Sequence, residues 1–212
     1  MQLEELANKL YRLLQDPLPG RLGQFAMAPQ PVDERRFMPI VREDHRKGAV
    51  LMLFYPDETG AFVPFIKRPE YDGVHSGQVA LPGGKMDPGD SDLSFTALRE
   101  AKEEIGVDPS KIELLGKLTE VYIPPSNFLV SPFIGITFEK PVFQPDPVEV
   151  ARIISCPVPT LLDKNIRKMG KVKASTGLHI QTPYFDIEQE MVWGATAMML
   201  SEFNYLWERS NP

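Results

Sequence analysis

The stretch GGKMDPGDSDLSFTALREAKEEIGV, residues 83–107, joins a diglycine turn, an acidic loop and a segment with helical spacing. We expect a helix over 92–105 that Gly106 terminates, because glycine readily adopts the left-handed conformation after a helix. At about 100° per residue, the three glutamates of this helix share a stripe roughly 100° wide. They are Glu100, Glu103 and Glu104, next to an apolar stripe of Leu98, Ala101 and Ile105 that we expect to face the core.

Such a stripe of carboxylates is either a solvated helix face or a cation site. Like charges at these spacings repel by a few tenths of a kcal/mol, and a divalent cation reverses the sign of that interaction. Mg²⁺ and Mn²⁺ prefer carboxylate oxygens and commonly share their coordination with substrate phosphates. The upstream glycines let the backbone approach a ligand closely. Together these features favour a pocket for phosphate and metal, with Arg99 placed to brace Glu103.

Composition limits the alternatives. The chain has 212 residues, 42% hydrophobic and 25% charged, which is typical of one globular core. A net charge of −6 argues against general affinity for nucleic acid. No apolar run reaches the ~20 residues of a membrane span, and the N-terminus lacks a secretory signal pattern. Cys156, the single cysteine, is expected to fill the core and fits a reducing compartment. We therefore expect a cytoplasmic protein.

Hydrophobic spacing predicts the order of the elements. Leucines three and four apart predict an amphipathic helix over 2–15, followed by a lead-in over 21–47 without clear periodicity. β-rich runs predict a hairpin of 48–56 and 61–68, a short strand within 77–84, and strands within 111–123, 132–139, 149–156 and 178–188. The basic stretch 161–177 is interpreted as a loop or short helix, and 190–209 as one long buried helix. This order predicts a mixed sheet flanked by helices, an α+β or three-layer α/β/α fold.

The stretch that opens this section resembles the signature box of the Nudix hydrolases. The matching positions are Gly84, Asp90, Arg99, Glu100, Ala101, Glu103, Glu104, Gly106 and Val107. The chain departs from the usual box at Asp90, where glutamate is usual, at the eight residues that separate it from Arg99 where seven are usual, and at the small Ala101. A longer loop with aspartate is similar to the coenzyme A diphosphatase branch of the family.

A second stretch, PFIKRPEYDGVHSGQVALPGG (64–84), resembles a motif of the same branch. The matching positions are Arg68, His75, Gly77, Gln78, Pro82, Gly83 and Gly84. The stretch departs at Pro69, at Asp72–Gly73 and at Leu81. The segments 130–135 and 192–197 are also similar to that branch, so the resemblance covers about residues 46–209.

The resemblance implies a Nudix-type α/β/α sandwich over 46–212 and hydrolysis of coenzyme A or acyl-coenzyme A to 3′,5′-ADP and 4′-phosphopantetheine derivatives, with Mg²⁺ or Mn²⁺ as cofactor. Residues 1–45 fall outside the resemblance, and we expect there an N-terminal helix and an extended lead-in that packs on the domain or serves a homodimer. From charge and hydropathy we expect no nucleic-acid and no membrane partner. One alternative keeps the chemistry but acts on ADP-ribose, NADH or another nucleotide. The other alternative is a Nudix-fold binding module without catalysis.

The resemblance also implies roles for individual residues. Candidate metal ligands are Glu100, Glu103, Glu104 and the Gly84 carbonyl. Candidate catalytic residues are Glu103, Glu104, Arg99 as an orienting group and Glu149 as a general base, for which a carboxylate of the box helix is the alternative. Candidate substrate-binding residues are Arg68, His75, Gln78, Gly83, Gly84 and Lys85. Structural roles remain open for Arg68, His75, Lys85 and Glu149, and Trp193 and Thr196 are interpreted as core.

Overall fold

The computed structural model describes residues 1–38, 44–71, 76–173 and 179–210, and within them eight strands form the main sheet. At its centre, β1 (Arg46–Asp57) pairs in parallel with β7 (Phe128–Ile136) and antiparallel with β2 (Gly60–Lys67). The sheet is therefore mixed, as the sequence predicts. The strand order is β3-β2-β1-β7-β5. The remaining strands are β3 (Val79–Ala80), β4 (Gly83–Lys85), β5 (Glu113–Lys117), β6 (Val121–Ile123) and β8 (Arg152–Pro157).

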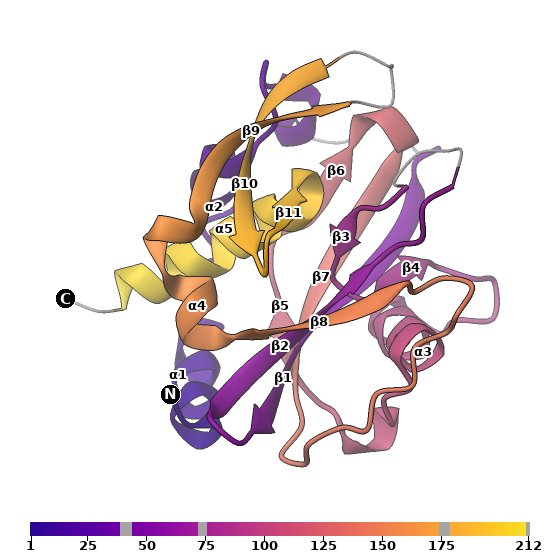
Figure 1. Cartoon of the computed structure of the whole chain (residues 1–212), viewed down its shortest axis with the longest axis vertical. Coiled ribbons are helices and arrows are strands. Elements are labelled where there is room, and N and C mark those ends of the chain that lie inside the picture. The colour runs from indigo at the N-terminus through magenta and orange to yellow at the C-terminus, as the bar shows by residue number, and fades with distance from the viewer. Residues whose placement is uncertain (39–43, 72–75, 174–178, 211–212) are drawn as a thin grey trace.

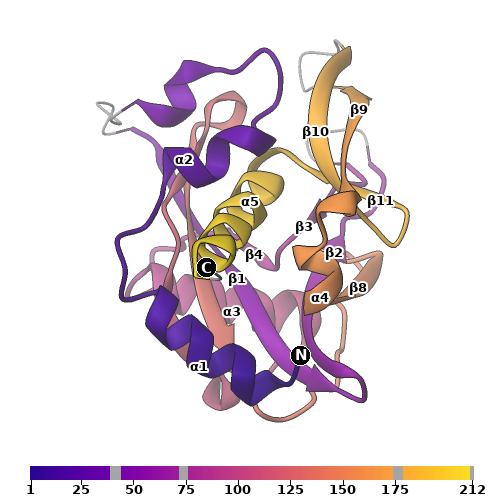
Figure 2. The ribbon, with the colours of Figure 1, turned by 90° about the vertical axis from the view of Figure 1, so that its left-hand side faces the viewer.

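Alternating side chains of β1 divide the core into two parts, one on each face of the sheet. Leu51 and Leu53 pack with the buried side of α3 (Leu93–Ile105), whereas Met52 and Phe54 belong to the larger cluster on the opposite face. That face is covered by α1 (Leu3–Leu13) and α5 (Gly194–Arg209), as Figures 1 and 2 show. The predicted three-layer α/β/α arrangement is thus confirmed.

A separate antiparallel sheet of β9 (Arg167–Lys173), β10 (His179–Ile187) and β11 (Glu190–Trp193) corrects two predictions. The segment 190–209 is not one helix, because its first four residues pair with β10 before α5 begins. The turn between these strands uses Glu188 and Gln189 at positive φ, without the glycine that usually marks such a hairpin. The basic stretch 161–177 contains β9, which has no buried face and so shows no apolar alternation.

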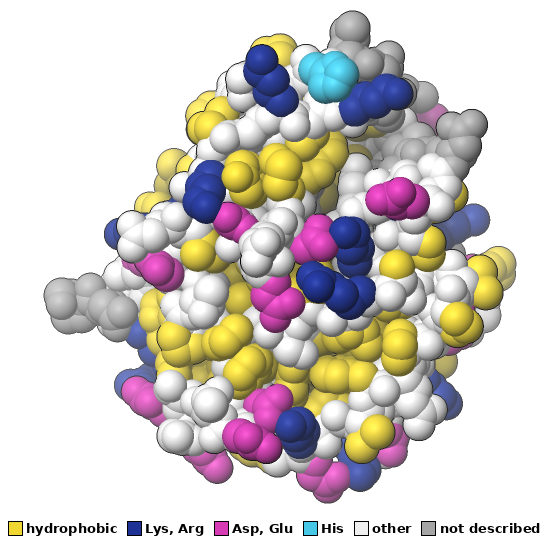
Figure 3. All heavy atoms as spheres, in the orientation of Figure 1, with side chains coloured by type: hydrophobic (Ala, Val, Ile, Leu, Met, Phe, Trp, Pro, Cys, Tyr) yellow, Lys and Arg dark blue, Asp and Glu magenta, His cyan; other side chains and the backbone are white. Residues whose placement is uncertain are grey.

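Ion pairs join this small sheet to the main sheet. Lys67 of β2 lies 2.8 Å from Glu190 of β11, and Arg152 of β8 lies 3.5 Å from the same carboxylate. Basic and acidic side chains gather in the middle of the face shown in Figure 3. The two sheets therefore meet through charged side chains that face solvent.

The N-terminal residues pack onto the main body. The predicted helix over 2–15 is confirmed as α1, whose Leu6 and Leu10 are buried in the larger core cluster. The lead-in is not simply extended, since it contains α2 (Arg21–Gln24) and the short 3₁₀ helices η1 (Phe25–Met27) and η2 (Glu34–Phe37). The division into an extension of 1–45 and a domain of 46–212 stays a prediction.

The remaining predicted elements differ from the structure at their ends and, for 77–84 and 111–123, in number. The stretch 77–84 contains β3 and the start of β4, so the diglycine expected in a turn is part of a strand. The hairpin of β1 and β2 is confirmed. The predicted strand 111–123 is two strands, β5 and β6, and the strands β7 and β8 begin at Phe128 and Arg152. Short helices connect the strands: η3 (Pro109–Lys111), η4 (Pro124–Ser126), α4 (Val158–Leu162) and η5 (Lys164–Ile166). Cys156 is buried, as expected, and burial raises the pKa of its thiol to about 12. Among the described residues, we find no helix with the length and apolarity that crossing a bilayer requires.

Candidate active site

Helix α3 is fixed at both ends by the residues that the sequence indicates. The carboxylate of Asp92 accepts a hydrogen bond from the Phe95 amide at 2.9 Å and caps the N-terminus. Gly106 ends the helix at a φ of 74°, in the left-handed region. Ala101 and Ile105 are fully buried against the sheet. The apolar stripe therefore anchors α3 and leaves its carboxylate side toward β4.

The diglycine, expected in a turn, lies in strand β4, and its backbone comes directly against the first glutamate of the box. A Cβ atom on Gly84 would lie 2.5 Å from the Glu100 carboxylate carbon, closer than a side chain tolerates. Gly83 has a φ of 152°, and a Cβ there would meet the Ala49 carbonyl oxygen at 2.3 Å. Both glycines are needed for β4 to lie between β1 and α3. The expected close approach of backbone and carboxylate is present.

Glu104 is the most buried carboxylate of the site, with its side chain 1% exposed. Its Oε2 accepts a hydrogen bond from the Gly83 amide at 2.7 Å, and its Oε1 lies 3.7 Å from Nη2 of Arg68. Burial raises the pKa of Glu104 to about 8, against the stabilising effects of the Gly83 amide and Arg68, and Glu100 and Glu149 raise it further. This carboxylate is held in place at considerable electrostatic cost.

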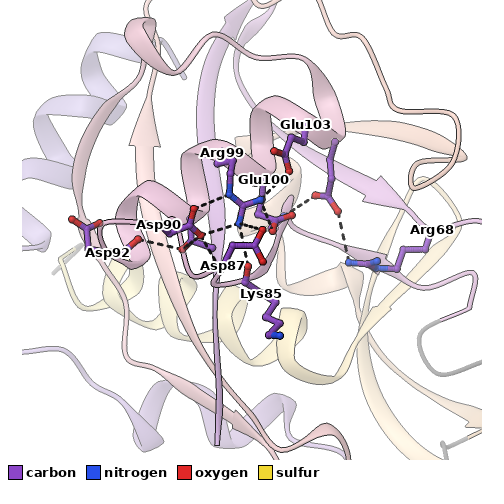
Figure 4. A network of polar contacts seen from close by, with 11 residues as sticks. Arg68, Lys85, Asp87, Asp90, Asp92, Arg99, Glu100 and Glu103 are labelled. Atoms are coloured by element: carbon purple, nitrogen blue, oxygen red, sulfur yellow. Dashed lines mark hydrogen bonds and ion pairs between the residues drawn. The ribbon is translucent and has the colours of Figure 1, made fainter.

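Arg99 connects the acidic loop to the helix (Figure 4). Its Nε and Nη2 each lie 2.9 Å from an oxygen of Asp90, in a two-point pair. Its Nη1 lies 2.8 Å from Glu103 and 3.0 Å from Glu100, and Nη2 donates to the Lys85 carbonyl at 3.1 Å. The bidentate partner expected among the glutamates is thus Asp90, while two glutamates receive single contacts.

The three glutamates do not all face the same space. The side chain of Glu100 is 14% exposed, and burial raises its pKa, which Arg99 opposes. The side chain of Glu103 is 58% exposed, and this residue does not line the cavity described below. Glu100 and Glu104 lie about 40° apart around the helix, whereas Glu103 lies on the other side of Glu100, toward solvent and Arg99. The convergence of all three glutamates on one cation stays a prediction.

Glu100 and Glu104 are the two box glutamates that lie against the glycine backbone of β4. Within the parts of the chain that the structure describes, no three His, Cys, Asp or Glu side chains converge to hold a metal as they stand. The three glutamates are held by protein groups instead: Arg99 contacts Glu100 and Glu103, and the Gly83 amide contacts Glu104. The partly buried Glu100 and the buried Glu104, next to a glycine backbone, are oxygen donors of the kind that hard divalent cations prefer.

A cavity of about 1040 Å³ collects most of the other candidate residues. Glu100 and Glu104 line it, together with Arg68, Gln78, Gly83, Gly84, Lys85 and Glu149. Glu149 is exposed and lies three residues before β8, where its amide lies 3.3 Å from the Asp146 carboxylate. His75 lies outside the described residues. The structure thus brings the second motif (64–84) and the box to one cavity.

Sequence reasoning missed several lining residues. Trp193 and Thr196, interpreted as core, line the cavity at the junction of β11 and α5. Arg36 in η2 and Phe128 in β7 also line it. A signal existed for the first pair, since the segment 192–197 resembles the coenzyme A branch. Arg36 lies in a lead-in without any periodicity, and no local pattern indicates its position.

The profile of the NUDIX domain matches residues 45–169, more than half of the chain. Nudix hydrolase 15, mitochondrial, of Arabidopsis thaliana is 34% identical over 183 residues, covering 84% of this chain and 62% of that protein. The uncharacterized Nudix hydrolase NudL of Yersinia pestis is 31% identical over 158 residues, covering 74% of this chain and 77% of that protein. The fold and the box thus define the class, and the chain belongs to the Nudix family.

Solved structures agree on the fold. The Nudix hydrolase RenU of M. smegmatis superposes with a TM-score of 0.54 at 16% identity, over 79% of this chain and 88% of RenU. The MutT protein of Methanosarcina mazei gives a TM-score of 0.50 at 14% identity, over 81% and 100%. The predicted Nudix fold is confirmed, and the class of enzyme expected, a Nudix hydrolase, is the class named for these relatives. The chain spans less than two thirds of its plant relatives, 62% and 55%.

Proposed function

We propose that this protein hydrolyses the diphosphate of coenzyme A or acyl-coenzyme A, releasing 3′,5′-ADP and (acyl-)4′-phosphopantetheine. The observation that carries the proposal is the shared cavity, whose wall contains the partly buried Glu100 and the buried Glu104 together with Arg68, Gln78 and the Gly83–Gly84 backbone. Carboxylates for a cation and an arginine for phosphate are the groups that attack at a diphosphate requires.

We assign Mg²⁺ or Mn²⁺ as the cofactor, since Nudix hydrolases generally use divalent metal ions. Glu100, Glu104 and the Gly84 carbonyl would hold the ion, and Glu103 joins them only if Arg99 releases it. When bound, the ion neutralises charge on the phosphates and makes water more acidic. A nearby cation also favours the ionised form of Glu104, whose pKa burial raises to about 8.

The protein groups around the cavity would divide the remaining work. Arg99 positions Glu100 through its contact at 3.0 Å and ties the helix to the loop through Asp90. Arg68 is 30% exposed and only 3.7 Å from Glu104, so its guanidinium retains donors for a phosphate oxygen. Glu149 lines the cavity from an exposed position and is the proposed general base. Gln78 and Lys85, which also line it, would contact the substrate.

Two features support coenzyme A over a smaller nucleotide. The motif similar to the coenzyme A branch supplies Arg68, Gln78, Gly83 and Gly84 to the cavity wall. The cavity volume of about 1040 Å³ lies at the upper end of the usual range for ligand sites. ADP-ribose, NADH and nucleoside triphosphates contain the same scissile linkage and are the competing substrates.

A substrate panel tests the proposal. Purified protein is incubated with coenzyme A, acetyl-coenzyme A, ADP-ribose, NADH and ATP, each with Mg²⁺, Mn²⁺ or EDTA, and the products are separated by chromatography. We expect metal-dependent cleavage fastest for the coenzyme A pair. If only ADP-ribose or NADH were cleaved, that compound would replace coenzyme A as the proposed substrate. If no compound were cleaved, the result would favour the binding module. Homodimer formation and a cytoplasmic location stay predictions.

A further inference from the structure

Two neighbouring arginines of η2 (Glu34–Phe37) lie in contrasting surroundings. The side chain of Arg35 is 71% exposed and pairs with Asp33 at 2.7 Å. Arg36 lines the cavity instead, and its Nε is buried without a hydrogen-bond partner among the residues that the structure describes. Its Nη1 reaches the Tyr122 carbonyl only at 3.5 Å. The second arginine is therefore a poorly satisfied cation in the wall of the active-site cavity.

A half-buried cation whose Nε has no hydrogen-bond partner among the described residues needs an explanation. A guanidinium offers five N–H donors in a rigid fork, and leaving them unmet away from water is unfavourable. Burial lowers the pKa of Arg36, which reflects the same lack of compensation. An anion that enters the cavity would supply the missing acceptors, and the planar fork suits phosphate oxygens well.

Part of the cavity wall comes from outside the family profile. The profile matches residues 45–169, whereas Pro29 and Arg36 precede it and Ile180 and Trp193 follow it. The carboxylates, in contrast, all lie within the match. Arg36 and the carboxylates thus reach one cavity from separate parts of the chain, as is expected where a specificity subsite is added to a catalytic site.

We propose that Arg36 is a specificity-determining residue that binds a phosphate monoester of the substrate, one that is not part of the scissile diphosphate. The substrate class is then a nucleoside diphosphate derivative with an additional phosphate on its ribose. This inference rests on the proposed function, because it uses the same cavity. Its consequence is discrimination against nucleotides that lack the additional phosphate.

Binding of two matched nucleotides tests the subsite without any hydrolysis. 3′,5′-ADP and 5′-AMP differ only by the 3′-phosphate, and calorimetry on the full chain gives both dissociation constants. We expect the wild type to bind 3′,5′-ADP at least about tenfold more tightly. Arg36→Gln reduces that ratio to within twofold, and Arg36→Lys gives an intermediate ratio because it keeps the charge but loses the fork. The control, Arg35→Gln, removes the same charge one residue away and keeps the wild-type ratio.

The outcomes that overturn the proposal are distinct from those that overturn the proposed function. Equal binding of the two nucleotides by the wild type overturns it, as does a loss of the ratio in Arg35→Gln. If the role of Arg36 were only structural, Arg36→Gln would weaken the binding of both nucleotides alike and lower the melting temperature. We expect the melting temperature of Arg36→Gln to equal or exceed that of the wild type, since the variant removes a half-buried and poorly compensated cation. Failure of hydrolysis with the binding ratio intact would contradict only the proposed function.

Discussion

Arg99 of α3 and Asp90 of the preceding loop form a two-point ion pair, with Nε–Oδ1 and Nη2–Oδ2 distances of 2.9 Å each. Asp90 also accepts hydrogen bonds from the Thr96 hydroxyl at 2.8 Å and the Asp87 amide at 2.9 Å. These contacts hold the pKa of Asp90 well below its usual range, Arg99 being the main cause. The loop between β4 and α3 is thus fixed by the carboxylate of Asp90.

We predict that Asp90→Asn lowers the melting temperature at pH 7 by roughly 5 °C and reduces hydrolysis, because Arg99 loses its charged partner and Glu100 its fixed brace. A carboxyl with a depressed pKa stabilises the fold above the pKa of the unfolded chain and loses that effect as the pH falls below it. The deficit of the variant should therefore shrink below about pH 4. Thermal melts from pH 3 to pH 8 measure this.

The control for this prediction is Asp87→Asn in the same loop. The Asp87 side chain is 61% exposed and lies 3.9 Å from Arg99. Its removal should leave the melting temperature nearly unchanged. Equal losses in the two variants would show that the pair with Asp90 has no special role.

Gly84→Ala tests the contact between the turn and Glu100. The added Cβ would lie 2.5 Å from the Glu100 carboxylate and would displace it. We expect hydrolysis to fall by about 100-fold, as for a misplaced catalytic group. Gly89→Ala is the matched control, because a Cβ there meets nothing within 4 Å. Steady-state kinetics of both variants measure this effect. A normal rate in Gly84→Ala would show that the contact between β4 and Glu100 has no role in hydrolysis.

Glu104→Gln should abolish most activity while preserving the fold. The amide oxygen keeps an acceptor for the Gly83 amide, which Glu104 receives at 2.7 Å. We expect turnover to fall at least about 100-fold because a cation ligand is lost. Glu103→Gln should cost less, since Glu103 is exposed and does not line the cavity. The opposite ranking, with Glu103→Gln the more damaging, would restore the ligand role that the sequence implies for Glu103.

The same substitution makes a prediction about pH in the absence of metal. Since burial raises the pKa of Glu104 to about 8, the protonated form is favoured in the folded state. Its contribution to stability is complete below the pKa of an unfolded glutamate and is lost as the pH rises through about 8. The free energy of unfolding of the wild type in EDTA should fall by a few kcal/mol between pH 5 and pH 9, and Glu104→Gln should flatten this slope. Urea titrations at each pH measure this dependence. A slope for Glu104→Gln equal to that of the wild type would contradict the prediction.

Local chemistry explains why part of the site follows from the sequence. The helix over 92–105, its Gly106 terminus and the approach of Gly84 to Glu100 depend on neighbours within about twenty residues, and spacing encodes them. Placement of Arg36 and Trp193 depends instead on long-range packing of η2 and β11, which no local period records. The helical wheel places the three glutamates in one stripe but does not record that Arg99 holds Glu103, which depends on the rotamers of both side chains.

Glu202 of α5 provides a test of how the N-terminal lead-in is held. Its buried carboxylate accepts hydrogen bonds from the Gly20 amide at 3.1 Å, Gln24 Nε2 at 2.8 Å and the Thr119 hydroxyl at 2.6 Å. Glu202→Ala should destabilise the protein by about 2–4 kcal/mol, because buried donors lose their acceptor. Glu208→Ala, on the same helix with a side chain 39% exposed, should cost less than about 1 kcal/mol. Urea unfolding measures the free energy of unfolding of both variants. Equal losses would refute the role of Glu202 in holding the lead-in.

The central claim is metal-dependent cleavage of coenzyme A within the cavity of Glu100 and Glu104. Its most direct test is mass-spectrometric product analysis of coenzyme A, incubated with Mg²⁺ or Mn²⁺ beside ADP-ribose. The account predicts 3′,5′-ADP and 4′-phosphopantetheine from the wild type, and neither product with EDTA or with Glu104→Gln. Intact coenzyme A alongside cleaved ADP-ribose, or cleavage that persists in EDTA, would contradict it.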